Sequence, residues 1–120
     1  MPQPVKAILL IVALFAATPA AAQLLGLGFE SNIELTKHDL ALIRQTVGQE
    51  VHGHPVGTTA SWSNINSGNY GNIRLLKEYT SNGLRCETVE YTVATKRMAV
   101  HPEHYTLNSC LQPDGTWKIS

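Results

Sequence analysis

The sequence has few charged residues, few cysteines and no strongly basic stretch. Only 15% of its 120 residues are charged, and nine basic residues balance nine acidic ones. Because no basic stripe is present, nucleic acid is not an expected partner. The chain also lacks a polybasic membrane-surface segment, a G-x-S-x-G nucleophile elbow and the lysine of a phosphate-binding loop. We therefore predict no catalytic residue and no cofactor.

No apolar run reaches the length of a typical membrane-spanning helix. The longest one, residues 7–17, follows a start with one positive charge, Lys6, whereas a spanning helix needs about 20 apolar residues. Residues 18–22 then end in small side chains spaced as in a signal-peptidase site. This order favours a secretory signal over a membrane anchor. We predict a signal peptide over residues 1–22, cleaved after Ala22, and a soluble mature protein in the periplasm or the medium.

Export bears directly on the two cysteines, Cys86 and Cys110. An exported chain meets oxidising conditions, which favour a disulfide over free thiols. Two cysteines allow only one connectivity, and a bond across that loop would stabilise the fold by about 3.5 kcal/mol in the loop-entropy model. We predict this disulfide, and two buried free thiols are the alternative.

The residues after the signal suffice for one small domain. We predict a flexible leader over residues 23–35, which begins with a glycine-containing segment without periodicity, and a domain over residues 36–120. A helix is predicted over residues 37–51, because Thr36 and Asp39 fit a capping box and Gly53 ends the pattern. Its apolar stripe has spacings of three and four and consists of Leu40, Ile43, Val47 and Val51.

From Gly57 onward the pattern is that of short strands joined by turns. The predicted strands are residues 58–62, 73–80, 84–94, a strand interrupted by Pro102, and 116–119. Asn64–Asn72 is predicted to be a loop, Asn82-Gly83 a type I′ hairpin turn, and Glu87-Thr88 the site of a β-bulge. The fold class is therefore α+β, with one N-terminal helix packed on an antiparallel meander of four to five strands.

The histidines are the first residues to consider for chemistry. Four of the five occur as His52-x-His54 and His101-Pro-Glu-His104. Imidazoles at such short spacing can share a zinc or copper ion, which makes these four weak metal candidates. Both pairs fall at the ends of predicted elements, where solvated histidines are common, so we predict no metal site.

Carboxylates and aromatic side chains give two further candidate sites. Glu87 and Glu90 lie three apart in a strand and would point to different faces, so we interpret them as solvated charges and not as a glycoside-cleaving pair. Trp62, Tyr70 and Trp117 could form an exposed platform for sugars, but we predict that the tryptophans belong to the core.

Two segments, GTTASWSNINSGNYGNI (57–73) and QPDGTWKI (112–119), together resemble a known family. It is the C-terminal domain of the rickettsial-type 17-kilodalton outer-membrane surface antigens, and the resemblance extends over about residues 36–119. The matching motif residues are Gly57, Trp62, Asn64, Ser67, Gly68, Gly71, Cys86, Cys110, Asp114, Gly115 and Trp117. The resemblance implies a Gram-negative envelope protein and brings no catalytic residues.

The chain also departs from that family. The usual proline after the motif asparagine is Ile65, and Glu87 and Leu111 replace arginines that often follow the two cysteines. The lipid-accepting cysteine and glycine zipper of many members are not found, so we expect no membrane anchor. We therefore predict an exported, non-enzymatic interaction module that binds an envelope protein or peptidoglycan. The alternative is a small periplasmic metal-binding protein or hydrolase that uses the histidine clusters.

Overall fold

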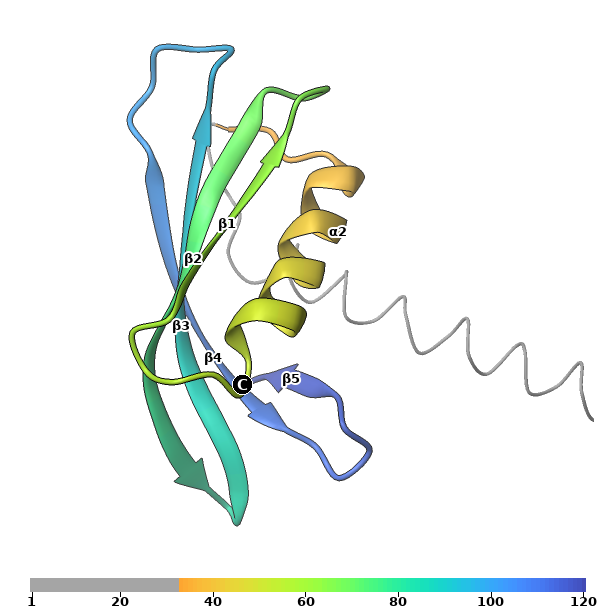
Figure 1. Cartoon of the computed structure of the whole chain (residues 1–120), viewed down its shortest axis with the longest axis vertical. Helices are drawn as coiled ribbons and strands as arrows, with labels where there is room; N and C mark the ends of the chain where they lie inside the picture. Colours follow the sequence, from red (N-terminus) through yellow and green to blue (C-terminus); the bar gives the residue numbers. More distant parts are fainter. Residues whose placement is uncertain (1–32) are drawn as a thin grey trace, which may run out of the picture.

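A computed structural model describes residues 33–120 as one helix packed on one sheet (Figure 1). The helix α2 (Lys37–Thr46) continues as a π-helical segment η1 (Val47–Val51). The strands are β1 (Thr59–Asn64), β2 (Asn69–Ser81), β3 (Leu84–Thr95), β4 (Glu103–Leu111) and β5 (Trp117–Ile119). The five strands lie in sequence order with every neighbouring pair antiparallel. This is the predicted α+β meander; the predictions for residues 1–32 lie outside the described residues.

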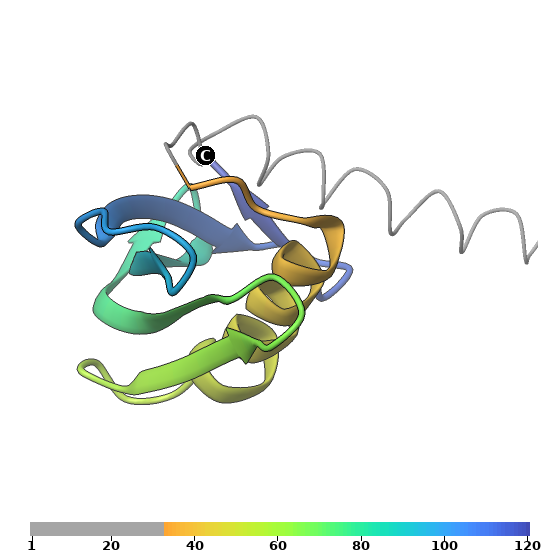
Figure 2. The same ribbon diagram turned by 90° about the horizontal axis from the view of Figure 1, so that it is seen from above.

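The helix covers one face of the twisted sheet, as Figure 2 shows from above. Its apolar stripe meets the inward side chains of the first three strands of the sheet. The resulting core consists of Ile33, Ile43, Val47, Val51, Ala60, Trp62, Ile73, Leu75, Val89, Tyr91 and Val93. None of the helices in the described part of the chain is long and apolar enough to cross a membrane.

Both ends of the helical segment agree with the sequence. The Thr36 hydroxyl accepts a hydrogen bond from Asp39 N (3.0 Å), and Thr36 N donates to Asp39 Oδ2 (2.8 Å), which completes the capping box. The helical segment ends at Val51. Its last five residues widen into a π-helix, which the periodicity did not predict.

The predicted leader reaches too far into the domain. Ile33 is 2% exposed and belongs to the core, and Leu35 packs against the same cluster. Residues 33–35 are therefore part of the folded domain. The sequence pattern missed Ile33 because one buried side chain in a short extended segment gives no periodicity.

The predicted loop over Asn64–Asn72 is wrong in its second half. β2 begins at Asn69, and only the residues between β1 and β2 form the turn. Asparagine and glycine usually indicate turns, but Asn69 and Gly71 are buried in the strand and paired with β1. The other predicted hairpin is confirmed, since Asn82 and Gly83 both have positive φ, as a type I′ turn requires.

The β-bulge is close to its predicted position but lies on the neighbouring strand. Leu75 pairs with Val89 and Lys77 with Thr88, so the extra residue, Leu76, belongs to β2. β3 keeps a regular alternation that turns Glu87 toward the helix, where it is 0% exposed. The interpretation of Glu87 as a solvated charge is therefore wrong.

The predicted disulfide between Cys86 and Cys110 is confirmed. The two residues face each other directly across β3 and β4. Because Cys86 is adjacent to the inward Glu87, the bond lies on the face of the sheet opposite the helix. It therefore joins two strands of the meander without taking part in the helix–sheet core.

Candidate functional site

A buried carboxylate, Asp39, organises the N-terminal end of the helix. Its Oδ1 accepts hydrogen bonds from Asn64 Nδ2 (2.8 Å) and Ser67 Oγ (2.7 Å). Its Oδ2 accepts from Asn69 Nδ2 (2.8 Å) and Thr36 N (2.8 Å). Asp39 is 0% exposed, so these four donors compensate for the loss of water around its charge.

The network keeps Asp39 ionised. Burial alone would raise the pKa of its carboxyl group, but the hydrogen bonds from Thr36, Asn69, Ser67 and Asn64 together hold that pKa below the usual value. Two of the donors, Asn64 and Ser67, belong to the family motif, and the resemblance assigned no role to them. Their structural role is to bind the helix carboxylate to the β1–β2 turn.

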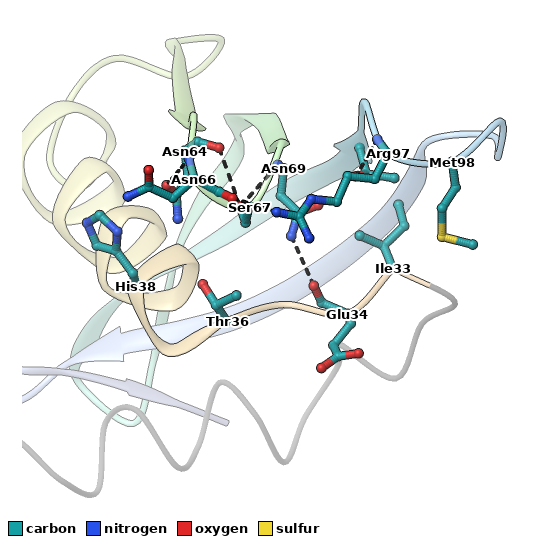
Figure 3. Close-up of a pocket in the computed structure, with 11 residues that line it drawn as sticks. Ile33, Glu34, Thr36, His38, Asn64, Asn66, Ser67, Asn69, Arg97 and Met98 are labelled. Carbon is teal, nitrogen blue, oxygen red and sulfur yellow. Dashed lines mark hydrogen bonds between the residues drawn. The ribbon is translucent and has the colours of Figure 1, made fainter.

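A surface pocket of about 480 Å³ lies beside this network, and we call it the motif pocket (Figure 3). Its lining residues come from the segment before the helix, the first turn of α2, the region of the β1–β2 turn, and the end of β3 with the residues that follow it. They are Ile33, Glu34, Thr36, His38, Asn64, Asn66, Ser67, Asn69, Thr95, Arg97 and Met98. Asn69 Nδ2 also donates to the Glu34 carbonyl (2.9 Å), which ties the first described residues to the sheet. The motif pocket is therefore lined mostly by polar residues, with apolar side chains at one end.

Arg97 supplies the positive charge of the motif pocket. Its Nη2 donates to the Asn66 carbonyl (2.6 Å), and its aliphatic part passes over Gly68, where an added Cβ would lie 3.1 Å from Arg97 Cγ. Gly68 also has a φ of +77°, a conformation that favours glycine. Gly68 therefore leaves room for the Arg97 side chain beside the turn.

A second polar cluster lies under the C-terminal end of the helical segment. His52 Nδ1 lies 2.6 Å from Glu87 Oε1, and Gly53 N donates to Glu87 Oε2 (2.9 Å). A carboxylate only accepts hydrogen bonds, so Nδ1 carries the proton. The His52 ring also stacks on Trp117, with centroids 4.1 Å apart and planes 6° apart. The cluster thus joins the end of the helix to β3 and β5.

Burial sets the protonation of this cluster. It lowers the pKa of His52, and the hydrogen bond and charge of Glu87 partly oppose this change. It also raises the pKa of the Tyr91 hydroxyl far above the usual value, with the charge of Glu87 acting in the same direction. The arrangement therefore favours a neutral imidazole and a neutral phenol beside one carboxylate.

The same cluster borders a cavity of about 280 Å³, which we call the His52 pocket. The lining residues are Arg44, Val47, Gly48, His52, Tyr91, Leu107, Ser109, Gly115, Thr116, Trp117 and Ile119. Glu87, His52 and Ser109 are the residue types of a hydrolytic triad, but Ser109 makes no hydrogen bond to His52. The geometry therefore provides an oriented imidazole without a hydrogen bond to that serine hydroxyl.

The four histidines singled out in the sequence have separate environments. His52 belongs to the buried cluster, while His54 is exposed, with Nε2 3.3 Å from the Gln49 carbonyl. His101 is exposed before β4, and His104 Nδ1 lies 3.2 Å from Thr92 Oγ1 on the outer face of the sheet. Across residues 33–120, no three histidine, cysteine or acidic side chains group closely enough to hold a metal ion.

The aromatic residues do not form a common platform. Trp62 is on β1 and Trp117 on β5, the two opposite edges of the sheet, and three strands lie between them. Trp62 is 5% exposed and lies in the core, as predicted. Trp117 is only half-buried, and its partner is a histidine that the sequence had assigned to solvent.

The remaining motif residues shape turns. Gly57 (φ +95°) and Gly115 (φ +89°) have conformations that favour glycine, and Gly115 N donates to Gln112 O (2.9 Å). Asp114 Oδ1 accepts hydrogen bonds from Thr116 Oγ1 (2.6 Å) and Thr116 N (3.0 Å), which hold the pKa of Asp114 below its usual value. These contacts position the final strand and, with it, Trp117.

The fold and the two pockets define a small, disulfide-closed α+β domain with a polar network at one end and a buried histidine–glutamate pair at the other. The chain is 31% identical over 86 residues to the 17 kDa surface antigen of Rickettsia bellii and 32% identical over 86 residues to those of Rickettsia conorii and Rickettsia rickettsii. Each alignment covers 71% of this chain and 52% of the relative.

These matches confirm the resemblance to the 17 kDa surface antigens. The chain spans about half the length of the curated relatives it matches. No family model matches the sequence. No solved structure matches it either.

Proposed function

We propose that this chain is an exported, non-enzymatic cell-envelope protein whose domain binds a protein or cell-wall partner at the motif pocket. The name of its relatives, surface antigen, supports a place in the envelope of a Gram-negative cell. The signal peptide predicted over residues 1–22 supports export to the periplasm or the medium. The motif pocket supports binding as the activity.

The observation that carries this proposal is the unused hydrogen-bonding capacity of Arg97. A guanidinium has five N–H donors, and the structure gives this one a single acceptor, the Asn66 carbonyl, among residues 33–120. Figure 3 shows the Arg97 side chain beside Asn69 within the pocket. Free guanidinium donors suit a carboxylate or another anionic group of a partner.

The surroundings of Arg97 favour a peptide-like partner. Asn66 is exposed and offers an amide, while Ile33 and Met98 give one end of the pocket apolar surface. A short polar chain with an acidic group would use both kinds of surface. Envelope proteins and the peptide part of the cell wall both present such groups.

The internal bonding of the site supports a non-enzymatic role. Asp39 already accepts four hydrogen bonds, and Ser67 donates its hydroxyl proton to Asp39. An acid and a hydroxyl bound in this way act as fixed parts of the scaffold, because neither is oriented toward a reacting group. The network thus holds the pocket in one shape before the partner arrives.

Binding can be tested by crosslinking the full chain in cells and recovering it from envelopes, together with sedimentation with purified peptidoglycan. We expect a specific protein or peptidoglycan to be recovered, and Arg97→Gln to reduce recovery about tenfold, as the loss of a charge-assisted contact does. Arg85→Gln is the matched control, because Arg85 is an exposed arginine paired with Glu78 at the far end of β2 and β3. Equal recovery of Arg97→Gln and the control would contradict the proposed site.

Export is tested separately by cell fractionation and by mass measurement of the recovered protein. We expect a mature chain that begins at Gln23 in the periplasm or the medium. Recovery only in a membrane pellet that resists salt would contradict a soluble exported protein. Turnover of a cell-wall or peptide substrate, abolished by one substitution outside the core, would contradict the non-enzymatic assignment.

A further inference from the structure

The His52 pocket has a charge that the domain itself does not neutralise. Arg44 lines this pocket near the end of α2, and its side chain makes no hydrogen bond or ion pair with any other described residue. The buried carboxylate nearby, Glu87, is already engaged by His52 and Gly53. An anion that enters the pocket would therefore meet an unpaired cation.

The remaining lining of the pocket is largely apolar. Val47, Leu107, Trp117 and Ile119 contribute hydrocarbon and aromatic surface from the helical segment and the last two strands. The volume of about 280 Å³ lies near the lower end of the range for small-molecule sites, which combine an apolar lining with a few placed polar groups. The pocket thus fits a fragment-sized ligand better than a folded partner.

Two features determine the shape of the pocket walls. The stacking of His52 on Trp117, and the bond from His52 to Glu87, fix the indole of the final strand against the core. On the helical side of the pocket, the helix widens into the π-helical segment that contains Gly48, where an added Cβ would have no other atom within 4 Å. π-Helical turns occur frequently at functional sites.

We propose that the His52 pocket binds a small apolar carboxylate, with the carboxylate at Arg44 and the apolar or aromatic body against Trp117 and Leu107. The Nδ1 of His52 is committed to Glu87, so in that tautomer the imidazole offers the ligand no hydrogen-bond donor and Arg44 alone holds the carboxylate. This site is independent of the proposed binding at the motif pocket, which lies at the other end of the helix.

The test uses the chain as exported, isotopically labelled for NMR, with 3-phenylpropionate as the probe and 3-phenylpropanamide as its neutral counterpart. We expect saturable shifts of the Gly48, Gly115 and Thr116 amides with the carboxylate. The amide should bind about tenfold more weakly, because it loses the charge-assisted bond to Arg44. Shifts concentrated at the motif pocket, or equal affinity for the two probes, would overturn the proposal.

Variants separate the ligand site from general effects on the fold. Arg44→Gln should weaken binding of 3-phenylpropionate about tenfold and leave binding of the amide unchanged. Arg74→Gln is the matched control, since Arg74 is an exposed arginine on the opposite face of the sheet, and it should bind both probes as the unaltered chain does. If Arg44→Gln retains the preference for the carboxylate, the assigned role of Arg44 is wrong.

The absence of any saturable shift up to about 10 mM probe, a concentration that would reveal even a weak millimolar site, would also overturn the proposal. It would leave the proposed function untouched, because the Arg97 experiments do not use this cavity.

Discussion

Trp62 and Gly71 face each other across β1 and β2, and the tryptophan occupies space that the glycine leaves free. A Cβ added to Gly71 would lie 2.9 Å from Trp62 Nε1 and 1.8 Å from the Thr92 carbonyl oxygen. Both contacts are too short for any side chain. The two motif residues therefore form one unit, in which the missing side chain of Gly71 lets a large aromatic ring enter the core.

The Trp62–Gly71 contact predicts that Gly71→Ala is strongly destabilising. The added methyl group must displace backbone of β3, so we expect a loss of about 2–3 kcal/mol in the free energy of unfolding, as overpacked cores show. Urea denaturation followed by tryptophan fluorescence measures this loss.

Gly48→Ala is the matched control for that change. Gly48 is exposed in the helical segment and has nothing within 4 Å of an added Cβ. We expect this variant to be unchanged or more stable by about 0.5–1 kcal/mol, because alanine restricts the unfolded chain. Similar stabilities for Gly71→Ala and Gly48→Ala would show that the close packing at Gly71 is not required.

Asp39→Asn should cost about 3 kcal/mol of stability. The amide oxygen can replace one carboxylate oxygen, but the amide nitrogen is a donor and would face two of the four hydrogen-bond donors. Glu50→Gln, an exposed acid in the same helical segment, should change stability by less than about 0.5 kcal/mol. Chemical denaturation of the two variants gives the comparison. A loss below about 1 kcal/mol for Asp39→Asn would mean that the network contributes little to the fold.

The lowered pKa of Asp39 also predicts how the protein unfolds in acid. The folded state holds the carboxyl pKa below 3.8, so its contribution is fully present above that value and is lost as the pH falls through the folded-state pKa. The free energy of unfolding should therefore decrease below about pH 4. If the Asp39→Asn variant shows the same decrease in the free energy of unfolding over this pH range, other carboxylates cause the decrease.

His52 predicts a separate pH dependence nearer neutrality. Its folded-state pKa is below 6.5, so the unfolded chain takes up a proton first as the pH falls, and stability declines from about pH 7 downward toward the folded-state pKa. His52→Gln should flatten this slope, whereas His54→Gln, which changes an exposed histidine, should preserve it. Thermal denaturation over this pH range distinguishes the two; an unchanged slope in His52→Gln would contradict the assignment.

The disulfide predicts that the exported protein has no thiol that reacts without a reductant. The bond links residues 24 apart in the sequence and so restricts the unfolded chain. Reduction removes this restriction and should lower the free energy of unfolding by about 3.5 kcal/mol. Mass spectrometry after alkylation counts the thiols, with a reduced sample as the control. Two labelled cysteines in the unreduced sample would contradict the bond.

Local patterns were enough to predict most of the backbone. The capping residues and apolar spacing located the helical segment over residues 37–51, and Asn82-Gly83 located the central hairpin. These features depend on residues close in the sequence. The α+β class then followed, because a single sheet of this size needs one cover for its apolar face.

The errors come from side chains whose partners are distant in the sequence. Cys86 is buried by its bond to Cys110 on the face of the sheet opposite the helix, so the inward position next to it falls to Glu87. Glu87 is tolerated there because His52, 35 residues away, provides a hydrogen-bond donor that offsets its burial. No periodicity within one strand contains that information.

The candidate sites were predictable to different extents. The resemblance singled out Asn64, Ser67 and Gly68 but gave no reason for their presence, which becomes clear only from their contacts with Asp39 and Arg97. Arg44 and Arg97 were not singled out at all. Neither belongs to a recognisable motif, and only the pockets beside them give these charges a role.

The strand order has a consequence for assembly on the ribosome or during export, where the chain emerges from its N-terminus. Each strand pairs with the one before it, so the sheet can grow hairpin by hairpin without waiting for distant sequence. The Asp39 network is complete once residue 69 has emerged, whereas the stacking of His52 requires residue 117. The Asp39 network can therefore form before Arg97 completes the motif pocket, and His52 remains without its aromatic partner until Trp117 has emerged.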